Sequence, residues 1–151
     1  MSVAGYRKVK TKDELKKNQP AIASPRFLNK NDNLFKNAQN IKPLDGYEDI
    51  VVHGDPYSFI FKDSNGKESY VSFKEFSDIL RSSPVYKGGD IRLISCETAA
   101  EGSVTAQALA NELGVTVLAP TDIVGVYPDG EMFVGLTGEG RWVKIKPKKG
   151  V

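Results

Sequence analysis

One histidine and one cysteine stand out as the residues of this sequence best suited to catalysis. His53 follows the short apolar run Ile50–Val52, and Cys96 follows the similar run 91–95. A thiolate is a strong nucleophile, and a neighbouring imidazole promotes its formation at neutral pH. Open α/β sheets place their sites at the C-terminal ends of buried strands. The pattern therefore predicts a pair in which Cys96 attacks a carbonyl and His53 manages the protons.

Each residue of this pair also has a simpler explanation. An isolated buried cysteine is usually a small core residue, and a single histidine at a strand end is usually a hydrogen-bonded structural group. Gly54 directly follows His53 and favours catalysis, because a residue without Cβ lets the backbone approach a substrate closely. Asp49 and Asp55 are both near enough in sequence to orient His53, and the sequence does not choose between them.

Composition narrows the class of protein. The chain has 151 residues, of which 40% are hydrophobic and 26% charged, as expected for one globular domain with its own core. No apolar run approaches the roughly 18 residues that span a bilayer, and the first residues lack the apolar segment of a signal peptide. One cysteine excludes an internal disulfide and a cysteine-built zinc site, so we expect no metal centre.

Charge is distributed unevenly along the chain. Residues 1–46 hold ten Lys or Arg against four Asp or Glu, whereas residues 47–151 hold eleven against fifteen. The basic ends are explained either as solvated surface or as one polyanion-binding patch assembled from both ends. Residues 1–46 are rich in Asn and Lys and poor in apolar residues, so we expect a basic N-terminal arm or linker before a domain at 47–151.

From Tyr47 onwards, short apolar segments alternate with turn and cap signals. Together they predict an α/β sandwich with a mainly parallel central sheet, flanking helices and a C-terminal β-flap. Ser72 and Ser103 are the expected helix caps, and Gly114 is the expected helix stop. The expected elements are a strand at 50–52, a hairpin of 57–61 with 68–72, a helix at 73–80, a strand at 91–95, a helix at 103–113, a strand at 115–119, and an antiparallel set at 123–127, 131–134 and 142–146.

This order of residues and elements resembles the caspase-like (clan CD) cysteine peptidases. It is most similar to the autoprocessing cysteine protease domains of large secreted bacterial toxins, over about residues 47–147. The individual motifs are short, so the resemblance depends on their order and spacing. They are His53-Gly54 after a buried strand, Ile94-Ser95-Cys96 before the small-residue helix Ala106–Ala110, Ala119-Pro120-Thr121-Asp122, and Gly140-Arg141-Trp142 in a late flap.

The resemblance implies a cysteine endopeptidase in which Cys96 is the nucleophile and His53 the base. The backbone N–H groups of Gly54 and Cys96 would form the oxyanion hole, and preorganised donors of this kind lower the barrier to acyl transfer. Members of the clan commonly work as a Cys-His dyad. Four polar residues either line a substrate pocket or satisfy loop backbone groups, namely Ser95, Thr98, Thr121 and Asp122.

In the toxin proteases, inositol hexakisphosphate binds a basic cleft beside the flap and activates the site. No other cofactor is implied. This chain is shorter than those toxin domains, and its basic cluster does not by itself demand that ligand. The counterpart residues are Arg141, Lys144, Lys146, Lys148 and Lys149, with Arg7, Lys8 and Lys10 as further candidates.

The resemblance also implies a bacterial toxin domain that is secreted, delivered into a target cell and active in its reducing cytosol. Its partners would be a peptide substrate, either its own N-terminal arm or the parent toxin, and a cognate immunity protein. For cleavage in cis, Phe27-Leu28-Asn29 and Asn33-Leu34-Phe35 offer large apolar residues in an arm that is expected to be flexible.

Three other classes of function remain open at the level of sequence. The same dyad serves a glutamine deamidase or acyltransferase. A nuclease that uses the basic ends is disfavoured, because these residues are not interleaved with aromatic stacking platforms and no nucleic-acid-binding motif is present. A noncatalytic interaction domain would keep the fold without needing the Cys96 thiol.

Overall fold

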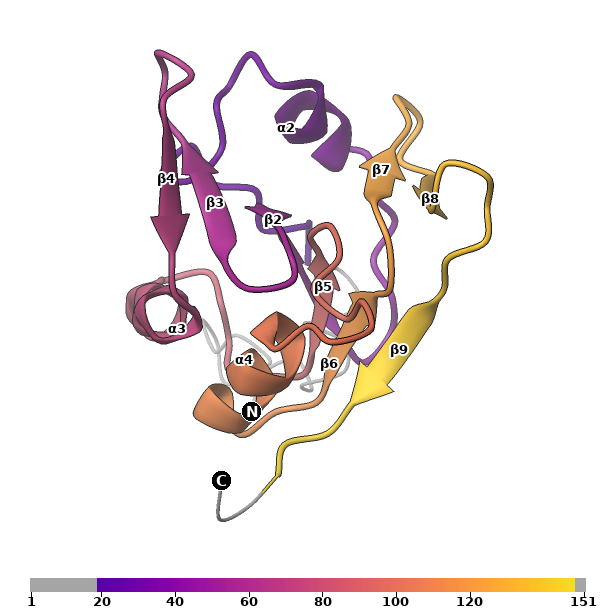
Figure 1. Ribbon diagram of the computed structural model, residues 1–151. Coiled ribbons are helices and arrows are strands. Elements are labelled where there is room, and N and C mark those ends of the chain that lie inside the picture. The colour runs from indigo at the N-terminus through magenta and orange to yellow at the C-terminus, as the bar shows by residue number, and fades with distance from the viewer. Residues whose placement is uncertain (1–18, 149–151) are drawn as a thin grey trace, which may run out of the picture.

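A mixed four-stranded sheet runs through the centre of the fold, in the order β1-β5-β6-β9 (Figure 1). The computed structural model describes residues 19–148. β1 pairs with β5 and β5 with β6 in parallel, whereas β9 runs antiparallel to β6. The expected α/β class is therefore confirmed. The strands span Glu48–Val51 (β1), Ile91–Ile94 (β5), Val117–Pro120 (β6) and Trp142–Ile145 (β9).

The parallel strands bury nearly all of their residues because both faces of the sheet are covered. Ile50, Val51, Leu93 and Ile94 have no exposed surface, and Val117 in β6 has none either. Strands that are buried on both faces have no reason to alternate polar and apolar residues. This pattern is the reason that the sequence located β1 and β5, and with them the positions of His53 and Cys96.

A second, antiparallel sheet of order β2-β3-β4 stands beside the first. The expected hairpin is confirmed, and its turn is closed by Asp63, whose Oδ1 accepts hydrogen bonds from the N–H groups of Asn65 and Lys67. Gly66 has a φ of +81°, a conformation that glycine adopts without strain. The strands span His53–Gly54 (β2), Phe59–Lys62 (β3) and Glu68–Val71 (β4).

Helices α3 (Phe73–Ser82) and α4 (Thr105–Leu113) pack against each other beside the sheets. Ser72 caps α3 as expected, since its Oγ accepts a hydrogen bond from the Glu75 N–H at 3.1 Å. The expected cap of α4 was wrong. Ser103 instead donates to the carbonyl of Thr98, so the helix begins at Thr105 without a side-chain cap.

The expected antiparallel set of three C-terminal strands is corrected by the structure. β7 (Val124–Val126) and β8 (Met132–Val134) form a hairpin of their own, and β9 pairs with β6 instead. The chain between β8 and β9 leads back to the central sheet, where the Thr121 N–H donates to the Arg141 carbonyl. β9 thereby becomes an edge strand of the central sheet.

The described part of the N-terminal arm contributes to the core. Ile22 forms a parallel bridge with Ile50 at the edge of β1. Phe27 packs against the rings of Phe61 and Phe76, with centroid distances of 5.3 and 5.6 Å. Helix α2 (Asn33–Ala38) follows and buries Ala38. The arm has few apolar residues, but the fold buries those at 22, 27, 28, 38 and 41. This segment is therefore part of the hydrophobic core.

Candidate functional site

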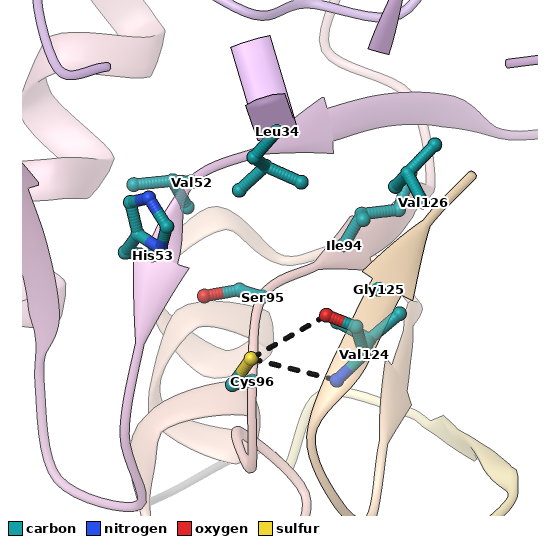
Figure 2. Close-up of a pocket in the computed structure, with 9 residues that line it drawn as sticks. All are labelled: Leu34, Val52, His53, Ile94, Ser95, Cys96, Val124, Gly125 and Val126. Atoms are coloured by element: carbon teal, nitrogen blue, oxygen red, sulfur yellow. Dashed lines mark hydrogen bonds between the residues drawn. The ribbon is translucent and has the colours of Figure 1, made fainter. Parts of the chain in front are cut away.

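His53 and Cys96 line one pocket, beyond the C-terminal ends of two neighbouring parallel strands. β1 and β5 pair through to Val51 and Ile94, so the residues that follow them emerge at the same edge of the sheet. The pocket has a volume of about 190 Å³ (Figure 2). Its lining residues are Leu34, Val52, His53, Ile94, Ser95, Cys96, Val124, Gly125 and Val126.

The imidazole of His53 is held by Asp32, which the sequence analysis did not single out. His53 Nε2 lies 2.5 Å from Asp32 Oδ2, and the other carboxylate oxygen accepts a hydrogen bond from the Leu34 N–H at 2.9 Å. Burial alone would raise the pKa of Asp32. The hydrogen bonds from His53 and from the Leu34 N–H, together with the electrostatic attraction of His53 and Lys62, outweigh burial and lower that pKa. A carboxylate only accepts hydrogen bonds, so the tautomer that fits this contact carries its proton on Nε2 and none on Nδ1.

Neither of the two aspartates suggested by sequence proximity bonds to His53. Asp49 forms a buried, bidentate pair with Arg92, with N···O distances of 2.5 and 2.8 Å. Asp55 closes the turn after β2 by accepting from the N–H groups of Tyr57 and Ser58. The only sequence signal for Asp32 was its suitability as the N-cap of a short helix, a role that it does fill in α2.

The thiol of Cys96 is partly buried and contacts the backbone of β7. Its sulfur accepts a hydrogen bond from the Val124 N–H at 3.4 Å and donates to the Val124 carbonyl at 3.5 Å. Burial raises the pKa of Cys96; the Val124 N–H opposes this shift, and the carboxylates of Glu97 and Asp122 add to it. The thiol is therefore protonated at neutral pH in this conformation. Among the contacts of the described residues, no hydrogen bond joins Cys96 to His53.

The backbone directly after Cys96 is strained. Glu97 has a φ of +60°, and within residues 19–148 it is the only non-glycine residue with a positive φ. This left-handed conformation costs an L-residue about 1 kcal/mol. The Glu97 N–H donates to the Asp122 carbonyl at 3.0 Å, which anchors the turn to the chain between β6 and β7. Strain of this kind concentrates at functional sites.

Of the four polar residues considered for a substrate pocket, Ser95 is the one that lines it. The other three satisfy backbone groups of the surrounding loops. Thr98 Oγ1 donates to the Ser95 carbonyl, Thr121 Oγ1 accepts from the Arg141 N–H, and Asp122 Oδ1 accepts from the Ile123 N–H. These bonds fix the loops that carry Cys96 and β7.

The described basic residues considered for polyanion binding lie directly before β9, on it and after it. Arg141, Lys144, Lys146 and Lys148 are exposed, whereas Lys149, Arg7, Lys8 and Lys10 lie outside the described residues. The segment after β9 is attached to α4, because Gln107 donates to the Lys146 carbonyl and Asn111 accepts from the Lys148 N–H. None of Arg141, Lys144, Lys146 and Lys148 lines the pocket of His53 and Cys96.

Two kinds of structural feature are absent from residues 19–148. No three or more His, Cys, Asp and Glu side chains lie close enough together there to hold a metal ion. No helix in that range is long and apolar enough to cross a membrane.

A family model described as a domain of unknown function (DUF8616) matches residues 23–134. The chain belongs to the DUF8616 family. The matched DUF8616 region includes Asp32 and every residue that lines the pocket. It ends before β9. No curated protein and no solved structure matches the chain.

Proposed function

We propose that this domain is a cysteine peptidase with a caspase-like site, in which Cys96 is the nucleophile, His53 the base and Asp32 the residue that orients His53. One observation carries the proposal. The single cysteine and single histidine of the chain, 43 positions apart in sequence, line the same pocket at the C-terminal edge of a mainly parallel sheet. The bond from Asp32 supports it, because it holds the imidazole in one tautomer.

The proposed reaction begins with transfer of the thiol proton to His53. The thiolate then attacks the substrate carbonyl carbon, and the carbonyl electron pair moves onto oxygen. Backbone N–H groups of Gly54 and Cys96 stabilise this oxyanion. When the intermediate collapses, the C–N bond breaks and His53 returns the proton to the leaving amine. Water, activated by His53, then hydrolyses the thioester and restores the thiol.

Attack requires the thiol to leave its resting position. Figure 2 shows the sulfur of Cys96 joined to the backbone of Val124 by two hydrogen bonds, with none drawn between it and His53. Rotation about the Cα–Cβ bond of Cys96 breaks the contacts with Val124 and frees the sulfur for attack. Those contacts are weak, since sulfur is a poor hydrogen-bond donor and acceptor, so the rotation is not costly.

The proposed substrate is a peptide with an apolar side chain beside the scissile bond. Leu34, Val52, Ile94, Val124 and Val126 give the pocket an apolar lining. The arm itself is a poorer substrate than the sequence suggested, because Phe27 and Leu28 are only 2% and 1% exposed and Leu34 is part of the pocket wall. Cleavage at these positions in cis would require the core to open. We therefore favour a substrate in another part of the parent protein or in another protein.

The wider biological setting belongs to the same proposal. Delivery as a toxin domain, action in the cytosol of a target cell, neutralisation by an immunity protein and activation by inositol hexakisphosphate all follow from the resemblance to toxin proteases. The exposed side chains of Arg141, Lys144, Lys146 and Lys148 support a polyanion site near β9. Glutamine deamidation or acyl transfer would use the same attack by Cys96 on a side-chain amide.

Active-site labelling followed by mass spectrometry tests the proposal. A peptidyl chloromethyl ketone ending in leucine is incubated with wild type, His53→Ala and Cys96→Ala, each with and without inositol hexakisphosphate. We expect a single label on Cys96 of the wild type, formed faster than on free cysteine and slowed by loss of His53. Labelling no faster than that of free cysteine under every condition would reject the peptidase and leave a noncatalytic domain.

A further inference from the structure

The hydroxyl of Ser95 is buried and has no hydrogen-bond partner, and Ser95 is one of the residues that line the pocket. Ser95 is only 1% exposed, and its Oγ is the one buried side-chain oxygen or nitrogen without a partner in residues 19–148. Buried hydroxyl groups are almost always hydrogen-bonded, because an unpaired one has lost its hydrogen bonds to water and has gained none in the protein. An unpaired hydroxyl on a residue of the pocket wall therefore indicates that a group of the ligand forms the missing hydrogen bond.

The surroundings of this hydroxyl place it beside the expected oxyanion hole. A Cβ built on Gly54 would lie 2.2 Å from Ser95 Oγ, so the missing side chain of Gly54 leaves the space that the hydroxyl occupies. In an antiparallel ladder, hydrogen-bonded and non-hydrogen-bonded residue pairs alternate. The N–H of Asp55 donates to the Ser58 carbonyl, so the next pair along the strands, Gly54 and Phe59, is not hydrogen-bonded. The N–H of Gly54 consequently points away from β3 and is available to a ligand.

The chemistry of the pocket restricts what that ligand group is. Apart from His53, Ser95 and Cys96, the lining residues contribute apolar side chains and one glycine. Figure 2 shows the Ser95 hydroxyl directed to the side of the pocket where His53 lies, with the Cys96 sulfur on the next residue. The carbonyl that Cys96 attacks is the one polar group that every acyl substrate must bring next to this sulfur.

We propose that the Ser95 hydroxyl donates a hydrogen bond to the substrate carbonyl oxygen, and that this bond strengthens as the oxyanion forms. The inference rests on the proposed function. The Cys96 sulfur forms a bond to the carbonyl carbon, the π electron pair moves onto oxygen, and Ser95 keeps its proton while donating to that oxygen. When the C–N bond breaks, the electron pair returns to the carbonyl and His53 protonates the amine. Ser95 thus touches the reacting atoms without exchanging a proton.

Two probes separate this role from thiol reactivity. A tripeptide aldehyde ending in leucinal forms a tetrahedral adduct with the thiol and so places an oxygen in the hole. Iodoacetamide alkylates the thiol by displacing iodide and forms no oxyanion. Ser95→Ala should weaken aldehyde binding by about 100-fold, the size of effect seen when one oxyanion donor is removed, and leave the alkylation rate of Cys96 unchanged.

Stability supplies an independent readout. Because Ser95 Oγ has no partner in the free protein, Ser95→Ala should leave the melting temperature unchanged or raise it. The matched control is Ser77→Ala, since Ser77 is also buried but donates to the Phe73 carbonyl at 2.8 Å. This control should lower the melting temperature and leave aldehyde binding unchanged.

The outcomes discriminate between the two proposals. If wild type and Ser95→Ala bind the aldehyde equally well, the Ser95 inference is wrong and the peptidase stands. If the wild type neither binds the aldehyde nor alkylates faster than free cysteine, the proposed function fails and the role of Ser95 fails with it. If a fluorophosphonate labels Ser95 in Cys96→Ala, Ser95 is a nucleophile rather than a hydrogen-bond donor, and the inference is overturned in that way.

Discussion

The Nε2 atom of His53 lies 2.5 Å from the Oδ2 atom of Asp32, across 21 positions of sequence. Asp32 is at the same time the N-cap of α2, whose residue Leu34 forms part of the pocket wall. One short helix from the N-terminal arm therefore orients the candidate base and closes the candidate substrate pocket. The arm belongs to the site as well as to the core.

Asp32→Asn tests the link between the arm and His53. Asparagine caps a helix about as well as aspartate, so this change removes the charge and leaves the cap of α2 in place. We expect labelling of Cys96 by the chloromethyl ketone to slow and the free energy of unfolding to fall by about 1 kcal/mol. Asp32→Ala loses the cap as well and should be less stable still. Equal labelling rates in Asp32→Asn and wild type would remove Asp32 from the catalytic group.

The lowered pKa of Asp32 predicts how stability depends on acid. Its pKa in the folded protein lies below the ordinary value of 3.8, so the unfolded chain binds a proton more readily than the folded one. The stabilising contribution is therefore complete above that ordinary value and is lost as the pH falls through the folded pKa. Urea unfolding at a series of acidic pH values should show a shallower decline for Asp32→Asn. Parallel curves for the two proteins would contradict this assignment.

Glu97→Gln should make the resting thiol more reactive. Burial is the main reason that the pKa of Cys96 is raised, and the negative charge of Glu97 adds to it. Removing that charge favours the thiolate, so the rate of alkylation by iodoacetamide should rise at a lower pH than in wild type. The measurement is the pH profile of that rate on both sides of pH 9, the ordinary pKa of a thiol. Coincident profiles would remove Glu97 from the causes of the raised pKa.

Asn37→Ala should loosen the strand that holds the thiol. Asn37 on α2 donates from Nδ2 to the Val126 carbonyl on β7 at 2.8 Å, and β7 also carries Val124. Loss of this bond should cost about 1 kcal/mol of stability and speed up alkylation of Cys96. Gln39→Ala is the matched control, because Gln39 bonds to the Phe35 carbonyl, outside β7. The same gain in alkylation rate in both variants would rule out a specific link through β7.

Gly54→Ala should destabilise the fold through a steric clash with Ser95, and a double mutant can isolate that clash. The new methyl group would lie 2.2 Å from Ser95 Oγ, and overpacking of this kind costs about 1 to 3 kcal/mol. In Gly54→Ala/Ser95→Ala the hydroxyl is gone, so the loss should be smaller than in Gly54→Ala alone. Chemical denaturation of the four proteins gives the coupling energy. Strict additivity would place the strain elsewhere.

Several features of this protein were determined by local sequence. The apolar runs that end near His53 and Cys96 predicted buried strands, because strands covered on both faces have no polar alternation. The Asn65-Gly66 turn, the Ser72 cap and the Gly114 stop located a hairpin and two helix ends, since each acts over a few residues. From these signals followed the α/β class and the placement of the candidate pair at one edge of the sheet.

Only the tertiary structure decided the partners across the chain. That Asp32 rather than Asp49 or Asp55 bonds to His53 depends on where the arm lies against β1, and no local pattern encodes that distance. The pairing of β9 with β6 likewise depends on a loop that leads back to the sheet. The unpaired state of Ser95 is invisible in sequence, because a hydroxyl lacks a partner only when the surrounding atoms have all been placed.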